Sequence, residues 1–210
     1  MSATVEPKKH IVVIGGGFAG LNCARRFAKH DGVRVTLIDR HNYTQFQPLL
    51  YQVAAGLLAP GNVSFSLRNI LVRHANIEVK MAEIVSLDLK ERTAVAADGQ
   101  TYRGDYLVLA AGSQPDFFGI PGADRFSFPL YSLHDAEVLR SRILAVLEAA
   151  DRDPSLIAKG ALNFVIVGAG ATGTEMAGTL GDLMHGVLKD GKRQSNPIYE
   201  VRGLTAELVG

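Results

Sequence analysis

The sequence is poor in several features that would each indicate a particular class of protein. It has one cysteine, Cys23, in 210 residues, so no disulfide can form within the chain, which fits a reducing compartment. Basic and acidic residues number 22 and 21, so neither a nucleic-acid surface nor an acidic tail is indicated. No apolar run reaches the roughly 18 residues of a membrane-spanning helix. The polar N-terminus does not resemble a signal peptide, and the histidines show no metal-ligand spacing, so no metal site is expected.

The residues that are present open with the pattern of a parallel α/β unit. His10–Ile14 is a short β-branched run typical of a strand buried on both faces, and three glycines follow it directly. Apolar residues then recur at helical spacing from Leu21 to Ala28, before an Asp31–Gly32 turn. Val33–Ile38 predicts the next strand, which ends at Asp39.

A G-x-G-x-x-G motif, formed by Gly15, Gly17 and Gly20, lies between that strand and that helix. The first glycine permits a tight turn, the second lets the backbone approach a pyrophosphate, and the third lets helix and strand pack closely. The helix N-terminus offers N–H groups to the phosphates. Asp39 can accept hydrogen bonds from ribose hydroxyls at the strand end. Because strand, helix and acid agree, we predict a dinucleotide site rather than a glycine-rich turn.

The middle of the chain predicts several short strands and one more buried strand. Ile77–Leu89, Thr93–Ala97 and Thr101–Tyr102 have strand composition, and Asp98–Gly99 supplies a hairpin turn. Tyr106–Ala110 is a continuous apolar run typical of a strand buried in a parallel sheet.

The second half repeats the opening pattern. Ser132–Asp135 predicts a capping box that begins a helix ending at a linker over Asp151–Pro154. Asn163–Val167 then predicts a strand leading into a second glycine motif and a helix from about Thr172. Two copies in the same context are far more specific than one, so we predict a second nucleotide site rather than a ligand-free turn. His185–Gly203 predicts turns, and the final residues predict a strand with Glu207 as the candidate ribose-binding acid.

These patterns predict an α/β fold of two Rossmann-like, doubly wound dinucleotide-binding units, the second one incomplete. The sequence resembles the type II NADH dehydrogenases, which are non-pumping NADH:quinone oxidoreductases of the two-dinucleotide-domain flavoprotein class. Phe46–Ala54 is the most family-specific segment, because the glycine motifs alone would fit any relative. The resemblance is carried by Ile11–Gly20, Val35–Arg40, Phe46–Ala54, Tyr106–Ser113 and Gly168–Ala177.

The resemblance implies two cofactor sites. Gly15–Gly20 and Asp39 would hold the ADP half of FAD, Ile84 would meet the adenine through its backbone, and Gln47 and Pro48 would lie near the flavin ring. The residues expected to bind FAD are Gly15, Gly17, Phe18, Ala19, Gly20, Asp39, Arg40, Gln47, Pro48, Ile84, Ala111 and Gly112. Those expected to receive NADH are Gly168, Gly170, Thr172 and Gly173.

Two further assignments follow from the resemblance. Glu175 matches a family glutamate near the nicotinamide, which gives it a catalytic position. A carboxylate there could equally stabilise the helix N-terminus by under about 1 kcal/mol, so both interpretations stay open. Ala111 and Gly112 would close over the cofactor where the chain leaves the FAD domain.

The resemblance also implies a domain plan and an activity. Residues 1–125 would form the first segment of an FAD-binding domain, 126–160 a connecting helix and linker, and 161–210 the start of an NADH-binding domain. The activity would be hydride transfer from NADH to FAD and two-electron reduction of a quinone. Family members are considerably longer, so we expect a fragment or a truncated product. The missing part would complete the FAD domain and attach the protein peripherally to the cytoplasmic side of the inner or plasma membrane, and a homodimer is compatible with the family.

Two alternatives stay open. One is a flavin reductase with a soluble acceptor such as ferredoxin or rubredoxin, although such proteins typically lack the Phe46–Ala54 pattern. The other is a non-catalytic nucleotide-binding module. Flavin disulfide reductases and sulfide-oxidising relatives are disfavoured, because His41–Pro60, where a redox cysteine pair would follow the ribose-binding acid, contains no cysteine.

Overall fold

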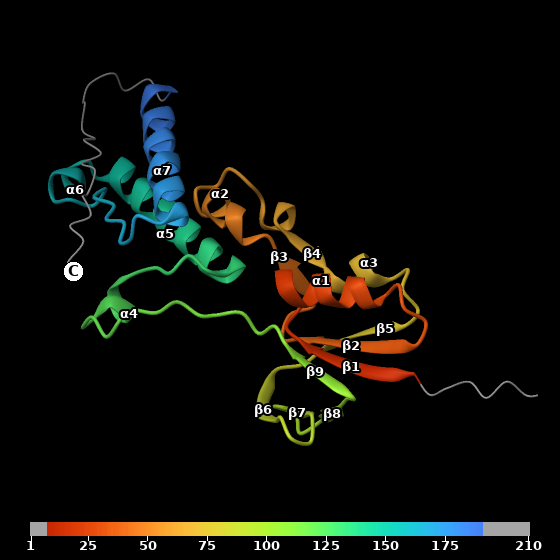
Figure 1. Ribbon diagram of the computed structural model, residues 1–210. Helices are drawn as coiled ribbons and strands as arrows, with labels where there is room; N and C mark the ends of the chain where they lie inside the picture. The colour runs from red at the N-terminus through yellow and green to blue at the C-terminus, as the bar shows by residue number, and fades with distance from the viewer. Residues whose placement is uncertain (1–7, 191–210) are drawn as a thin grey trace, which may run out of the picture. The chain divides into compact units, whose positions relative to one another are not determined.

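The computed structural model describes residues 8–190, which divide into two compact units. The first unit comprises the chain up to Gln45 together with Ser64–Gln114, and the second comprises Phe46–Val63 and the chain from Pro115 onward (Figure 1). Each unit is therefore built from segments that are distant in the sequence. The domain boundaries expected at residues 125 and 160 stay predictions.

The first unit is centred on a parallel sheet of four strands in the order β5-β2-β1-β9. These strands are β1 (Lys9–Ile14), β2 (Val33–Asp39), β5 (Ile77–Met81) and β9 (Tyr106–Leu109). The central strands β1 and β2 are the most buried, because both faces of the sheet are covered there. The predicted α/β class is confirmed by this sheet.

One face of that sheet packs against helices. Ile11, Val13, Val35 and Leu37 point to this face and form a core with Ala24 of α1. The helix α1 (Phe18–Phe27) follows the glycine loop, and the short α3 (Leu67–Leu71) contributes its buried leucines to the same core. A two-stranded ribbon of β3 (Tyr43–Gln45) and β4 (Ser64–Ser66) leads into α3.

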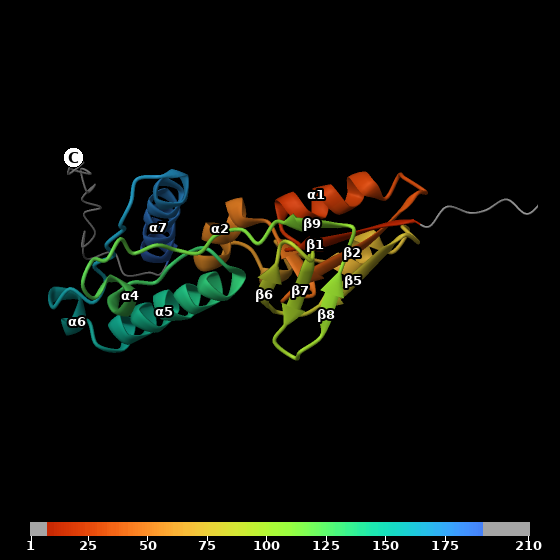
Figure 2. The same ribbon diagram turned by 60° about the horizontal axis from the view of Figure 1, so that its bottom comes forward.

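The opposite face packs against three antiparallel strands. These are β6 (Ile84–Asp88), β7 (Thr93–Ala96) and β8 (Thr101–Arg103), in the order β6-β7-β8. Val12, Ile14 and Ile38 form the core here with Ala94. Figure 2 shows the resulting three layers, with α1 on one side of the parallel sheet and β6–β8 on the other. The predicted strands at Thr93–Ala97 and Thr101–Tyr102 and the Asp98–Gly99 hairpin are confirmed, whereas the predicted run Ile77–Leu89 is divided between β5 of the parallel sheet and β6.

The second unit is helical in its described part. Its helices are η1 (Gln47–Leu49), α2 (Leu50–Ala54), η2 (Pro60–Asn62), α4 (Ala123–Phe126), α5 (Leu133–Arg152), α6 (Ser155–Ala158) and α7 (Ala171–Asp190). The helix α2 packs against both α5 and α7. The capping box predicted at the start of α5 is confirmed, since Ser132 and Asp135 bond reciprocally.

Three predictions about the second unit need correction or lie outside the structure. The strand predicted at Asn163–Val167 is wrong: the segment pairs with no strand among residues 8–190, and Val165 and Val167 are 73% and 84% exposed. A single apolar run cannot form a ladder without a neighbour, which explains the difference. Part of the turn region predicted from His185 is helical, because α7 continues to Asp190. The predicted final strand and Glu207 lie outside the described residues.

Candidate dinucleotide-binding site

The first glycine loop connects β1 to α1 through two positions that admit no side chain. Gly15 has a φ of +102°, and a Cβ there would collide with the carbonyl oxygen of Ala110, just after β9. A Cβ at Gly20 would collide with the carbonyl oxygen of Gly15. The loop, the first turn of α1 and the end of β9 therefore approach each other as closely as their backbones allow.

The middle glycine of the motif has open space instead. Gly17 is the N-cap of α1, is exposed, and a Cβ there would meet nothing within 4 Å. Its φ of −75° is accessible to any residue, so conformation alone does not require glycine here. The space lies at a helix N-terminus that no side chain caps, which is the arrangement that accepts a phosphate.

Asp39 links the end of β2 to this loop. Its Oδ2 accepts a hydrogen bond of 2.5 Å from the backbone N–H of Gly16, and its Oδ1 accepts one of 2.7 Å from the N–H of His41. Gly16 is buried, and a Cβ there would come within 2.6 Å of the Leu67 side chain. The carboxylate predicted for the ribose is thus held directly beside the first glycine loop, and Arg40 next to it is exposed.

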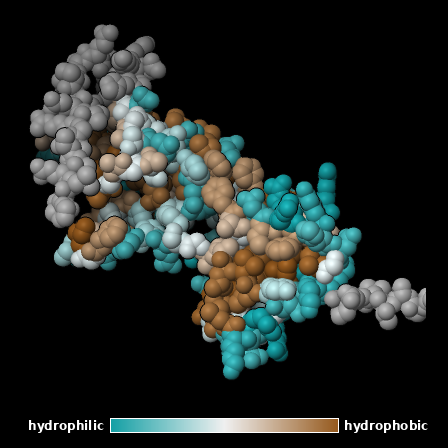
Figure 3. Space-filling view, viewed as in Figure 1, coloured by the Kyte–Doolittle hydropathy of each residue, from teal (hydrophilic) through white to brown (hydrophobic). Residues whose placement is uncertain are grey.

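An apolar hollow of about 360 Å³ opens at the carboxyl ends of β1 and β9. Ile14, Ile84 and Ala111 line it together with Leu109 of β9. Two residues predicted to bind FAD, Ile84 and Ala111, are therefore brought together beside the residue that precedes the glycine loop. Figure 3 shows apolar side chains gathered over this part of the first unit. Gly112 follows with a φ of +73° and open space at its Cβ position.

The second glycine loop has the same backbone geometry as the first. Gly168 has a φ of +97°, a Cβ at Gly173 would collide with the carbonyl oxygen of Gly168, and a Cβ at Gly170 would meet nothing within 4 Å. The first helical hydrogen bond is also equivalent, from Thr174 N–H to Gly170 O at 3.0 Å, as from Leu21 N–H to Gly17 O at 3.0 Å. One difference is that a Cβ at Gly168 would meet no neighbouring strand.

The remaining predicted residues lie in the second unit or at the exposed start of α1 in the first unit. Thr172 and Glu175 are exposed in the first turns of α7. Gln47 and Pro48 begin η1, where the half-buried Gln47 donates a hydrogen bond to the carbonyl oxygen of Tyr131. Phe18 and Ala19 are exposed in the first turn of α1.

Two contributors to the first site were not predicted from the sequence. Gly16 supplies the N–H that Asp39 binds, and Ala110 supplies the backbone against which Gly15 packs. The run of three consecutive glycines was a signal for the first, because only two of them belong to the motif. No local signal marks Ala110, since its contact joins positions 95 residues apart.

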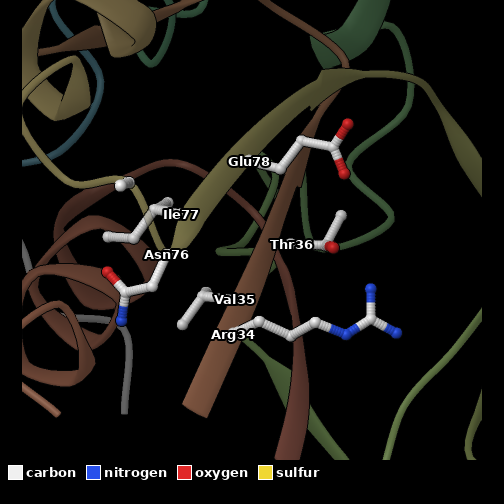
Figure 4. Close-up of a pocket in the computed structure, with 7 residues that line it drawn as sticks. Arg34, Val35, Thr36, Asn76, Ile77 and Glu78 are labelled. Atoms are coloured by element: carbon white, nitrogen blue, oxygen red, sulfur yellow. The ribbon is translucent and has the colours of Figure 1, made fainter. Parts of the chain in front are cut away.

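A second hollow, of about 190 Å³, lies at the amino ends of β2 and β5. Arg34, Thr36 and Glu78 lie on one side of these strands (Figure 4). His10 pairs there with Thr36 at 2.9 Å, and burial, followed by the charge of Arg34, lowers its pKa below the ordinary value. Ligands of parallel α/β sheets bind at the carboxyl ends of the strands, so this hollow is not the dinucleotide site.

Among residues 8–190, no three His, Cys, Asp or Glu side chains are grouped so that they could hold a metal ion. In the same part of the chain, no helix has both the length and the apolar character needed to cross a membrane.

Comparison with known proteins identifies a family of redox enzymes. Residues 9–193 match the family model described as pyridine nucleotide-disulphide oxidoreductase. The type II NADH:quinone oxidoreductase Ndh of Mycobacterium tuberculosis is 40% identical over 189 residues, covering 87% of this chain and 40% of that protein. The external alternative NAD(P)H-ubiquinone oxidoreductase B3 of Arabidopsis thaliana mitochondria is 32% identical, covering 87% of this chain and 33% of that protein.

A solved structure shares the fold. The chain matches NDH2 from Plasmodium falciparum, in complex with NADH, with a TM-score of 0.72 and 24% identity, over 87% of this chain and 38% of that one. The resemblance to type II NADH dehydrogenases is confirmed by these relatives. The chain spans 40% or less of the length of the three proteins named.

Proposed function

Because this chain belongs to the pyridine nucleotide-disulphide oxidoreductase family, we propose that it supplies the FAD site and part of the NADH site of an NADH:quinone oxidoreductase. The observation that carries the proposal is the pair of glycine loops with matching backbone geometry, one of them joined to a strand-end carboxylate by the Gly16–Asp39 hydrogen bond. Turns that bind no ligand would give no reason for the same backbone geometry to occur twice in one chain.

The residues of the first unit fit the ADP half of FAD. The open space at Gly17 and the uncapped start of α1 suit the pyrophosphate, and Asp39 suits the ribose hydroxyls. The apolar hollow lined by Ile84 and Ala111 suits an apolar ring system. Within the proposal, Phe18, Ala19, Gly20, Arg40 and Gly112 complete the set of neighbours, and residues 1–125 form the FAD-binding segment.

The second loop is proposed to receive NADH. The space at Gly170 and the start of α7, including Thr172, suit its pyrophosphate. Glu175 is proposed to lie near the nicotinamide, and Gln47 and Pro48 near the flavin. When bound, FAD would supply the redox chemistry, namely the acceptance of a hydride and the transfer of two electrons to the acceptor. The chain's own residues bind and orient the two nucleotides.

The finer aspects of the proposal concern the acceptor and the location. The names of the relatives support a quinone as acceptor. Quinones are membrane solutes, so we propose peripheral attachment of the whole protein to the cytoplasmic side of the inner or plasma membrane, and a homodimer as its assembly state. Sedimentation with lipid vesicles and light scattering of the longest natural polypeptide containing this chain test both points.

The decisive experiment measures flavin uptake and NADH oxidation. The purified chain is incubated with FAD, freed of excess cofactor and examined for flavin absorbance, with Gly17→Val as the negative control. NADH oxidation by the longest natural polypeptide containing the chain is then compared with a soluble quinone, ferredoxin and rubredoxin as acceptors. Quinone as the preferred acceptor is the expected result. A protein preferring ferredoxin or rubredoxin would be a soluble-acceptor reductase, and a chain that takes up no flavin would be a nucleotide-binding module at most.

A further inference from the structure

Gln47 is held by the backbone in a defined orientation. Its Nε2 donates a hydrogen bond of 3.2 Å to the carbonyl oxygen of Tyr131, which is 84 residues away in the sequence, and both residues are half-buried. A carbonyl oxygen can only accept, so the amide nitrogen must face Tyr131. The side-chain oxygen Oε1 is consequently at the other end of the amide, where it can accept a hydrogen bond from a ligand.

The peptide group that holds Gln47 is itself held by a carboxylate. The Tyr131–Ser132 peptide accepts from Gln47 through its C=O, and its N–H, on Ser132, donates to Oδ2 of Asp135 at 2.8 Å. The same Oδ2 also accepts from the N–H of Tyr131 at 3.2 Å. A peptide that donates to a charged acceptor becomes polarised, and its carbonyl oxygen becomes a stronger acceptor. Asp135 therefore acts on Gln47 through one peptide group.

The elements that carry these residues are packed together, which fixes the geometry of the chain of hydrogen bonds. Gln47 begins η1, which leads directly into α2, and α2 packs on α5. Leu50 of α2 is 1% exposed, and Leu133 and Ala136, on either side of Asp135 in the first turn of α5, are 8% and 0% exposed. Gln47 and Asp135 are thus attached to helices that cannot move independently without opening this core.

We propose that Asp135, besides capping α5, is a positioning residue for Gln47: through the Tyr131–Ser132 peptide it fixes the Gln47 amide so that Oε1 is presented to a ring N–H donor of the bound cofactor. The flavin part of this inference rests on the proposed FAD function, whereas the link between Asp135 and Gln47 does not. Asp135 lies outside Phe46–Ala54, the segment that carries the family-specific pattern.

The chain offers a matched control for helix capping. Ser132→Ala removes the hydroxyl that accepts from the Asp135 N–H at 3.1 Å, so it weakens the start of α5 but leaves both hydrogen bonds of the Tyr131–Ser132 peptide intact. Asp135→Ala keeps the backbone N–H that donates to Ser132 but removes the carboxylate, and with it the other half of the capping box and the link to Gln47. Asp135→Glu keeps a carboxylate and should restore the link, because Glu is favoured at this capping-box position. If Asp135→Ala does not fold, Asp135→Asn replaces it; its amide oxygen can still accept from Ser132 but carries no charge, so a partial movement of the Gln47 signals is then the expected result.

The test has a cofactor-free measurement and a flavin measurement. In the cofactor-free chain, the two Nε2 proton signals of Gln47, assigned by their loss in Gln47→Ala, are followed by ¹⁵N-resolved NMR. Asp135→Ala should move them to the values of a free glutamine side chain, and Ser132→Ala and Asp135→Glu should not. With FAD, Asp135→Ala and Gln47→Ala should each raise the Kd about tenfold, the loss expected for one hydrogen bond, and the double variant should show no further loss.

The outcomes separate the inference from the proposed function. Equal movement of the Gln47 signals in Ser132→Ala and Asp135→Ala would mean that Asp135 acts only by capping α5, and no movement in either would mean that the link does not exist; either result overturns the inference. Additive losses of FAD affinity in the double variant would also overturn it. A responsive Gln47 signal in a chain that binds no FAD would support the link and count against the FAD function.

Discussion

Replacing Asp39 by alanine tests the first site at the point where the structure makes its most specific claim. The carboxylate joins β2 to the glycine loop through Gly16 and to the following residue through His41, at 2.5 and 2.7 Å. Asp31, in the exposed turn before β2, is the matched control, because it carries the same charge and makes no such link to the loop. Both variants lose one negative charge from the same segment.

The expected magnitude follows from what each partner loses. The N–H of Gly16 is buried, so its charge-assisted hydrogen bond, once lost, costs about 1.5–3 kcal/mol of unfolding free energy. The N–H of His41 is exposed, and water replaces Asp39 there at little cost. Asp39→Ala should therefore destabilise the cofactor-free chain by about 1.5–3 kcal/mol, and Asp31→Ala by less than about 0.5 kcal/mol. Asp39→Asn should recover part of the loss, since its amide oxygen can still accept from Gly16.

The FAD affinity should change in parallel. Loss of the hydrogen bonds from the ribose hydroxyls, again about 1.5–3 kcal/mol, corresponds to a roughly 10- to 150-fold increase in Kd. Urea unfolding of the cofactor-free chain gives the first quantity, and titration of FAD fluorescence under conditions where every variant is folded gives the second. Equal unfolding midpoints and equal FAD affinities for Asp39→Ala and Asp31→Ala would refute the reasoning, because the carboxylate would then hold neither the loop nor the cofactor.

Three other predictions follow from single positions. Gly17→Val should abolish FAD binding and change the unfolding free energy by less than about 0.5 kcal/mol, because its side chain enters open space. Gly20→Ala should instead destabilise the cofactor-free chain, because its Cβ collides with the glycine loop. Urea unfolding and FAD titration distinguish these two effects. Since burial lowers the pKa of His10, the native state binds its proton less readily than the unfolded state, and stability should fall as the pH drops through and below about 6.5. His10→Gln should flatten this dependence in urea melts at several pH values, and an unchanged dependence would contradict the assignment to His10. Glu175→Gln should slow flavin reduction by NADH in stopped-flow measurements while changing the unfolding free energy by less than about 1 kcal/mol, and an unchanged rate would leave only helix stabilisation as its role.

The first unit could be predicted well from the sequence because its signals are local. The run His10–Ile14, the glycines and the strand ending at Asp39 each have a pattern that only one type of element satisfies, and the Asp98–Gly99 hairpin is set by its turn residues. The assignment of Phe46–Val63 to the second unit could not be predicted in this way. It depends on the packing of α2 against α5 and α7, which are distant in sequence and whose residues do not specify which helix they pack against.

The site residues show the same division between local and non-local information. The meeting of Gly15, Gly20 and Asp39 at one turn could be predicted, because a dinucleotide-binding turn demands those residue types at that spacing. The Gly16–Asp39 hydrogen bond and the proposed link between Asp135 and Gln47 could not be predicted. The first joins residues 23 positions apart, and the second depends on the hydrogen bond between Gln47 and Tyr131, which are 84 positions apart. Both use a backbone N–H or C=O, and almost every residue has these groups. Backbone partners leave no residue-specific mark on the sequence.

A comparison of the two glycine loops shows which contacts set the loop conformation and which contacts a strand of the sheet requires. Gly15 packs against the backbone of Ala110 just after β9, whereas no strand among residues 8–190 lies beside Gly168. Their φ values are nevertheless +102° and +97°, and the third glycine packs on the first in both loops. The loop conformation is therefore set by its own glycines and by the start of the following helix. Asn163–Val167, in contrast, could form a strand only beside a partner strand, and no such partner is present among residues 8–190. A glycine turn of this kind can accordingly form from local sequence alone, whereas the strand that precedes it forms only beside a partner strand.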